Sequence, residues 1–63
     1  MKWIKREAGE YDSQDERFHI INTWDRIHGN HWSLYDRETK NEYAYDSLRQ
    51  CKQISEKLIS INV

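Results

Sequence analysis

The hydrophobic and polar residues of this chain follow two different periods, one up to about residue 46 and another after it. In the first part, short β-branched and aromatic runs alternate with polar side chains and end at polar turns, which is typical of half-buried strands. In the second part, apolar residues recur at the three- and four-residue spacing of an amphipathic helix. The pattern therefore predicts an α+β fold in which the strands come first and one helix comes last.

Four segments have the strand pattern, and we expect them to pair in chain order because their connections are short. They span about residues 9–12, 18–24, 31–36 and 42–45. The first segment is short, so the sheet is expected to have three or four strands. The predicted architecture is an antiparallel β-meander with one C-terminal α-helix packed across one face, in a single small domain over residues 1–63.

The helix is predicted over about residues 47–61 from its start signal and its apolar stripe. Ser47 lies directly before the stripe and Gln50 follows three residues later, which is the spacing of a capping box. In such a box, each side chain satisfies a backbone amide that the first helical turn leaves without a partner. The stripe and the inward strand positions together predict a core of Phe18, Ile20, Trp32, Leu34, Tyr43, Tyr45, Leu48, Cys51, Ile54 and Leu58.

Charge and cysteine content narrow the functional classes. Ten Lys and Arg stand against eleven Asp and Glu, and the net charge of −1 gives no bulk attraction to nucleic acid or to an anionic membrane. The single cysteine, Cys51, cannot form an internal disulfide and falls at a core position, so a reducing, cytoplasmic location is expected. No long apolar run is present, and neither a signal peptide nor a membrane span is predicted.

Neither a catalytic site nor a metal site is predicted. The acidic residues lie in turns, and a small domain of one sheet and one helix leaves little room for a pocket in which carboxylates could face each other. His28 and His31, together with His19 and Cys51, carry the ligand atoms that zinc prefers. However, His31 is expected on the open sheet face and Cys51 in the core, so these residues do not converge. Polar loop histidines are the simpler interpretation, and no cofactor is expected.

Several large apolar residues remain after the core has been assigned, and they suggest a partner surface. Clustered exposed apolar residues often mark such surfaces, although Trp3 and Trp24 could instead wrap the edges of a small core. The uncovered sheet face and the loop over residues 25–30 are the predicted contact, and such a face would also suit a homodimer. The predicted partner-binding residues are Ile21, Trp24, Arg26, Ile27, His28, His31 and Tyr35.

The order of local motifs adds a resemblance to known families. The motifs are Trp3, Gly9-Glu10-Tyr11, Phe18-His19-Ile20, Trp32-Ser33-Leu34-Tyr35-Asp36 and Tyr45-Asp46-Ser47-Leu48. In this order they resemble a family of small phage and prophage β-β-β-α proteins, and because they are core and turn positions they carry no functional residues across. The element order also resembles the three-stranded arm-binding domains of tyrosine recombinases, which implies a sheet face that enters the DNA major groove.

The expected open face does not have the residues that groove reading needs. Base edges and phosphates are normally contacted by Arg, Lys, Asn or Gln. The face is expected to contain His19, Ile21, Thr23, His31, Ser33, Tyr35 and Ala44, and no Arg or Lys.

The favoured hypothesis is a non-enzymatic phage-type accessory protein that binds another protein, for example to block a host or defence factor. The alternative is a small nucleic-acid-binding domain that uses the same sheet face, with Tyr35, Trp24 and the histidines stacking on single-stranded bases. Its cationic border would be Lys2, Lys5, Arg6, Arg26 and Arg37. A structural module without a partner of its own is a third interpretation. The balanced charge favours the protein partner.

Overall fold

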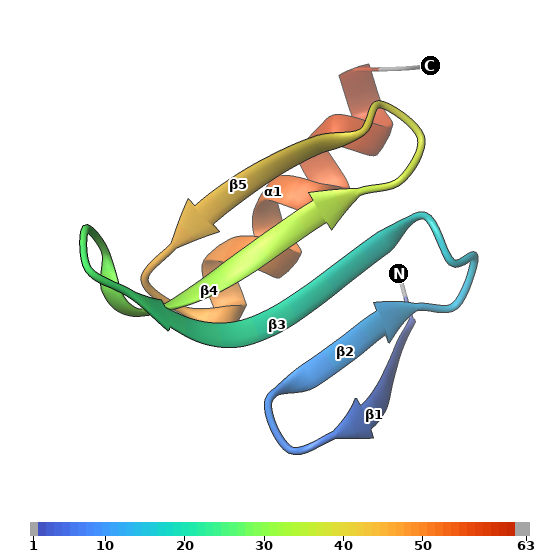
Figure 1. Ribbon diagram of the computed structural model, residues 1–63. Coiled ribbons are helices and arrows are strands. Elements are labelled where there is room, and N and C mark those ends of the chain that lie inside the picture. Colours follow the sequence, from blue (N-terminus) through green and yellow to red (C-terminus); the bar gives the residue numbers. More distant parts are fainter. Residues whose placement is uncertain (1, 62–63) are drawn as a thin grey trace.

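The computed structural model describes residues 2–61 as one antiparallel sheet with a helix across its back (Figure 1). The strands pair in chain order, β1-β2-β3-β4-β5. The predicted α+β meander with a C-terminal helix is therefore confirmed. The elements are β1 (Trp3–Glu7), β2 (Glu10–Ser13), β3 (Phe18–Asp25), β4 (Gly29–Asp36), β5 (Asn41–Tyr45) and α1 (Leu48–Ile61).

The prediction of three or four strands is wrong, because the sheet has five. The additional strand is β1, whose charged residues hide the alternation of an edge strand that is mostly exposed. Trp3 anchors this strand by packing against the core, while Gly9 in the left-handed region turns the chain into β2. The cations Lys5 and Arg6 thus lie on one arm of the first hairpin.

The register of the central hairpin assigns every strand residue to a face. β3 and β4 pair along their whole lengths, with Ile20 opposite Leu34 and Ile21 opposite Ser33. Because side chains alternate along a strand, the first pair faces the helix and the second lies on the open face. β3 and β4 also reach further than expected and leave only a turn at residues 26–28 in place of the predicted loop over residues 25–30.

The core lies between the sheet and α1, as predicted. Phe18, Ile20, Leu34 and Cys51 are completely buried, and the other predicted core residues are partly buried against them. The cluster also includes Trp3, Tyr11 and Ile59. Trp3 therefore wraps an edge of the core, which was one of its two expected roles.

The helix start has the predicted cap with one change of partner. The amide of Gln50 donates to the hydroxyl of Ser47 at 3.2 Å, as a capping box requires. The Gln50 side-chain oxygen accepts from the amide of Asp46 at 3.0 Å, one residue before the expected amide of Ser47. Within residues 2–61, no helix combines the length and apolar character needed to cross a bilayer.

A buried ion pair closes the end of the sheet opposite the β3–β4 turn. The Arg17 guanidinium donates to both oxygens of Asp36, at 3.1 Å and 3.0 Å, and stacks 4.8 Å from the centre of the Phe18 ring. Asp36 has no exposed surface, and its Oδ1 also accepts from the backbone amide of Glu38 at 3.0 Å. The hydrogen bonds from Arg17 hold the pKa of Asp36 below its usual value.

We expect Asp36→Asn to lower the free energy of unfolding by about 3 kcal/mol or to unfold the domain, because it leaves a desolvated guanidinium without its anion. Urea denaturation followed by circular dichroism measures this. Glu38→Gln is the matched control, because Glu38 also pairs with Arg17, at 3.4 Å, but is 64% exposed. Its loss should cost less than about 0.5 kcal/mol. Equal effects of the two substitutions would show that burial does not determine how much an ion pair with Arg17 contributes to the free energy of unfolding.

Candidate functional site

The seven predicted partner-binding residues fall on two different surfaces. Ile21, His31 and Tyr35 lie on the open face, since they alternate with the residues that face the helix. The other four lie at the end of the β3–β4 hairpin, which we call the hairpin tip: Trp24, Arg26, Ile27 and His28. The sequence predicts one contact, whereas the structure divides its residues between the open face and the hairpin tip.

Among residues 2–61, the two most exposed large apolar side chains lie at the hairpin tip. Ile27 is 89% exposed and Trp24 is 67% exposed. By strand alternation, Trp24 lies on the same side of the sheet as Ile20, the side that faces the helix. However, it is not among the residues that pack against the core. Figure 1 shows why, since the hairpin end projects past the sheet region that α1 backs. The alternative in which Trp24 wraps the core is therefore wrong.

Asp25 fixes the shape of this tip. Its Oδ1 accepts hydrogen bonds from the backbone amides of Ile27 and His28, at 2.8 Å and 2.6 Å. Gly29 then takes the left-handed conformation, with φ at +67°, which lets β4 start directly after the turn. Hydrogen bonds from His28 lower the pKa of the Asp25 carboxyl, so it is ionised at neutral pH. The exposed Ile27 is thus held on an ordered turn.

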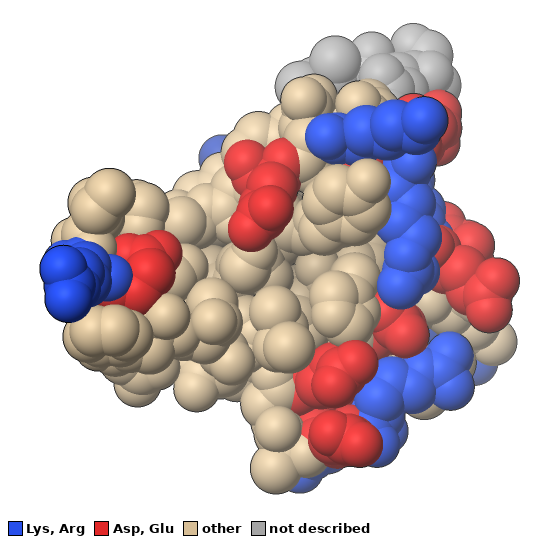
Figure 2. Space-filling model, in the orientation of Figure 1, with Lys and Arg blue, Asp and Glu red and all other residues tan. Residues whose placement is uncertain are grey.

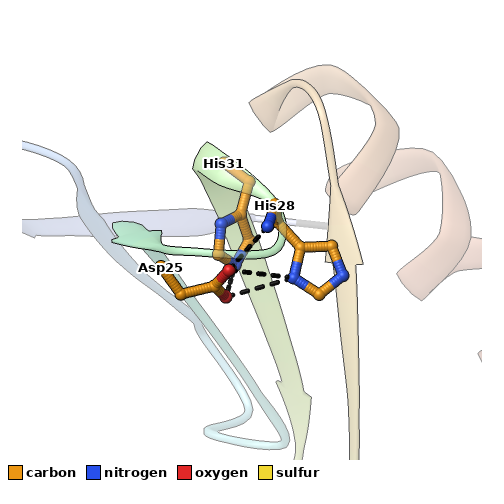
Figure 3. A group of neighbouring side chains, drawn as sticks. All are labelled: Asp25, His28 and His31. Atoms are coloured by element: carbon orange, nitrogen blue, oxygen red, sulfur yellow. Dashed lines mark hydrogen bonds and ion pairs between the residues drawn. The ribbon is translucent and has the colours of Figure 1, made fainter.

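Asp25 also lies beside two histidines, whose ring centroids are 5.0 Å apart (Figure 3). Its Oδ2 is 3.1 Å from Nδ1 of His28 and 3.7 Å from Nε2 of His31. One ligand-type atom from each of the three residues lies within 4.8 Å of the other two. His31 is only 6% exposed, whereas the side chains of Asp25 and His28 are about half exposed, at 47% and 51%. Three potential metal ligands therefore meet at the base of the tip.

The two other residues with ligand atoms that zinc prefers, Cys51 and His19, lie elsewhere. Cys51 is buried between sheet and helix, and burial raises the pKa of its thiol to about 11, which makes it a core residue and a poor nucleophile. His19 pairs with Asp12, with 2.7 Å between its Nδ1 and the carboxylate. Asp25 was not considered, although its spacing in Asp25-x-x-His28-x-x-His31 could have pointed to it once a hairpin was predicted there.

The open face carries a charged network around Asp12. The prediction that this face has no Arg or Lys is therefore wrong. Asp12 accepts from the Arg6 guanidinium at 3.0 Å and from Arg37 at 3.1 Å, in addition to His19. Arg6 reaches this face because β1 belongs to the sheet, and Arg37 reaches it from the β4–β5 turn. The cations counted as a border for nucleic acid are thus partly engaged by an internal carboxylate.

The environment of Asp12 has opposing effects on its pKa. Burial favours the neutral acid, but the hydrogen bonds from His19, Arg6 and Arg37 outweigh it and lower the pKa of Asp12 to about 2. Figure 2, which looks onto the open face, shows a mostly uncharged centre with acidic and basic side chains next to each other around the margin. Ile21 lies on this face of the middle strand, β3, and is 37% exposed.

Comparison of the chain with protein-family models, with curated proteins and with solved structures finds no match.

The Asp12 network predicts a specific acid response. The pKa of Asp12 is lower in the folded state, so its contribution to stability is present above about pH 4 and is lost as the pH falls through about 2. We expect Asp12→Asn to cost about 2 kcal/mol at pH 7 and much less at pH 2, as measured by urea denaturation at both values. The exposed Asp46→Asn should cost less than about 0.5 kcal/mol at pH 7. If Asp12→Asn lowers the free energy of unfolding as much at pH 2 as at pH 7, the charge of Asp12 is not the source of its contribution.

The exposure of Trp24 predicts the fluorescence of the protein. Trp3 and Trp32 are partly buried, so Trp24 should dominate acrylamide quenching and the long-wavelength emission. We expect Trp24→Phe to shift the emission maximum to shorter wavelength and to lower the quenching constant. Trp32→Phe is the matched control and should have the opposite effect on both quantities. A Trp24→Phe protein that is quenched as strongly as the native protein would show that Trp24 is covered.

Proposed function

We propose that this chain is a non-enzymatic, cytoplasmic accessory protein of the small phage type that binds another protein, with the hairpin tip as the central contact and the open face beside it. Blocking a host or defence factor is the kind of task that such binding would serve. The observation that carries the proposal is the exposure of Trp24 and Ile27 together at the end of one hairpin.

The chemistry of the tip favours a protein partner. Trp and Arg are enriched among the residues that dominate binding energy, and Trp24 and Arg26 both lie here beside Ile27. The turn is already ordered by the two amide hydrogen bonds to Asp25, so little conformational entropy would be lost on binding. A partner with an apolar pocket and an acidic rim fits this combination.

The open face supports the same conclusion. Ile21 on β3 is 37% exposed on this face. Arg6 and Arg37 are both hydrogen-bonded to Asp12, which reduces their availability to phosphates. With a net charge of −1, the chain gains no bulk electrostatic attraction to nucleic acid.

The proposal is tested by comparing variants of the tip with a variant of the sheet edge. A photo-crosslinking residue at position 30, which is exposed and pairs with Trp24 at the start of β4, would be placed in the native protein and in Trp24→Ala, Ile27→Ala and Ile4→Ala proteins, which are then exposed to lysate of the source cells. The same crosslinked protein should be recovered with the native protein and with Ile4→Ala, and should be lost or strongly reduced with Trp24→Ala and Ile27→Ala. Because Ile27 is 89% exposed, Ile27→Ala should change the free energy of unfolding by less than about 0.5 kcal/mol.

Three outcomes would contradict this proposal. Loss of the crosslink with Ile4→Ala but not with the tip variants would move the contact to the open face. Concentration-dependent self-association that Ile27→Ala abolishes would identify the partner as a second copy of the chain. Salt-sensitive binding to mixed-sequence oligonucleotides, measured by fluorescence anisotropy, would favour the nucleic-acid alternative, because counterion release is its signature.

A further inference from the structure

We propose that Asp25, His28 and His31 form a binding site for a divalent transition-metal ion of the zinc class. The ion would be held by one carboxylate oxygen and two imidazole nitrogens, which are ligands that Zn²⁺ takes readily. The site clamps the end of β3, the turn and the start of β4 together. Its ligands differ from the apolar residues of the proposed protein contact, so the two proposals stand on separate observations.

The separations of the potential ligand atoms suit such an ion. Ligands at about 2.0–2.1 Å from a tetrahedral ion are about 3.3 Å from each other. Oδ2 of Asp25 is 3.1 Å from Nδ1 of His28 and 3.7 Å from Nε2 of His31. The ligand atoms of His28 and His31 are at most 4.8 Å apart, so the half-exposed ring of His28 would make the largest adjustment on binding an ion.

His31 is oriented as a metal ligand should be. Its Nδ1 is 3.0 Å from the carbonyl oxygen of Gly29, and a carbonyl can only accept, so Nδ1 carries a proton. In the neutral ring, Nε2 then has its lone pair available, and this is the atom directed at Asp25. Ligating histidines characteristically donate their other ring N–H to a carbonyl or carboxylate, which fixes both the tautomer and the ring. The burial of His31 keeps this orientation in place.

The two oxygens of Asp25 have separate tasks. Oδ1 accepts the backbone amides of Ile27 and His28 and thereby holds the carboxylate in position. Oδ2 has no backbone donor and is the oxygen closest to the two histidine nitrogens. The turn therefore supplies the outer support for the ligand without using the oxygen that a metal would need.

Three protein ligands leave at least one coordination position for water, and the half-exposed side chains of Asp25 and His28 keep that side open to solvent. Occupation would hold Asp25, His28 and His31 together and would restrict the turn that carries Ile27. The ion is therefore expected to stabilise the protein whether or not a partner is present.

The experiment uses the full chain, free of any affinity tag, after treatment with a chelator. Isothermal titration with Zn²⁺ should show one ion per chain, and Co²⁺ should give the visible absorption of a site with nitrogen and oxygen ligands. The test variants are Asp25→Asn, whose amide oxygen can still accept the turn amides, and His28→Gln on the exposed ring. Because loss of an outer-shell partner alone costs 10–100-fold in affinity, each variant should weaken binding by about 100-fold or more.

The controls separate a built site from adventitious binding. His19→Asn removes the histidine outside the cluster, and Glu38→Gln removes an exposed carboxylate, so both should keep the native affinity. Circular dichroism of each metal-free variant verifies that it is folded. The native protein should also show a melting temperature that rises with Zn²⁺ concentration, an effect that Asp25→Asn and His28→Gln abolish.

The proposal is overturned if folded native protein binds no Zn²⁺, or if Asp25→Asn and His28→Gln bind it as well as the controls do. Neither result bears on the Trp24 and Ile27 crosslinks, so failure of this site and failure of the proposed protein contact are distinguishable.

Discussion

The pairing of β3 with β4 is the constraint on which the rest of this structure depends. Their register runs from Phe18 opposite Asp36 to Asp25 opposite Gly29 without a break. A shift by one residue would exchange the two faces, because side chains alternate along a strand. It would place Ile20 and Leu34 in solvent and bring polar residues such as Thr23 and Ser33 under the helix. The pairing of β3 with β4 therefore fixes the positions of both the core residues and the candidate site residues.

The two ends of this hairpin are stabilised in different ways. At one end, the buried Arg17–Asp36 pair closes the sheet, and the amides after Asp36 satisfy the same carboxylate. At the other end, Asp25 has an analogous position and also accepts two turn amides, but its neighbours are histidines and solvent instead of a guanidinium. At the first end, the ion pair satisfies both partners, whereas the second end leaves a carboxylate and two imidazoles beside the largely exposed side chains of Trp24 and Ile27. Function is best sought at the second end.

Small size explains why the exposed residues are informative. A domain of 63 residues has few large apolar side chains, and most of those in this chain are used in one layer between sheet and helix. Leaving Trp24 and Ile27 outside removes a large share of the available apolar surface from the core. Since that surface would otherwise stabilise the fold, its exposure at an ordered turn is consistent with selection for binding.

Local pattern was sufficient to predict the fold class and the helix with its Ser47 cap. All ten residues predicted for the core also lie in it, because each of these features depends on periodicity or on neighbours a few residues apart. β1 was missed because a charged edge strand buries little and shows no clear alternation. The open-face cations and the Asp25 cluster depend on which residues a five-stranded register places side by side, and no single strand carries that information. Sequence alone thus determined what each segment is, and the tertiary structure decided which side chains meet, because pairing brings together atoms that the chain keeps apart.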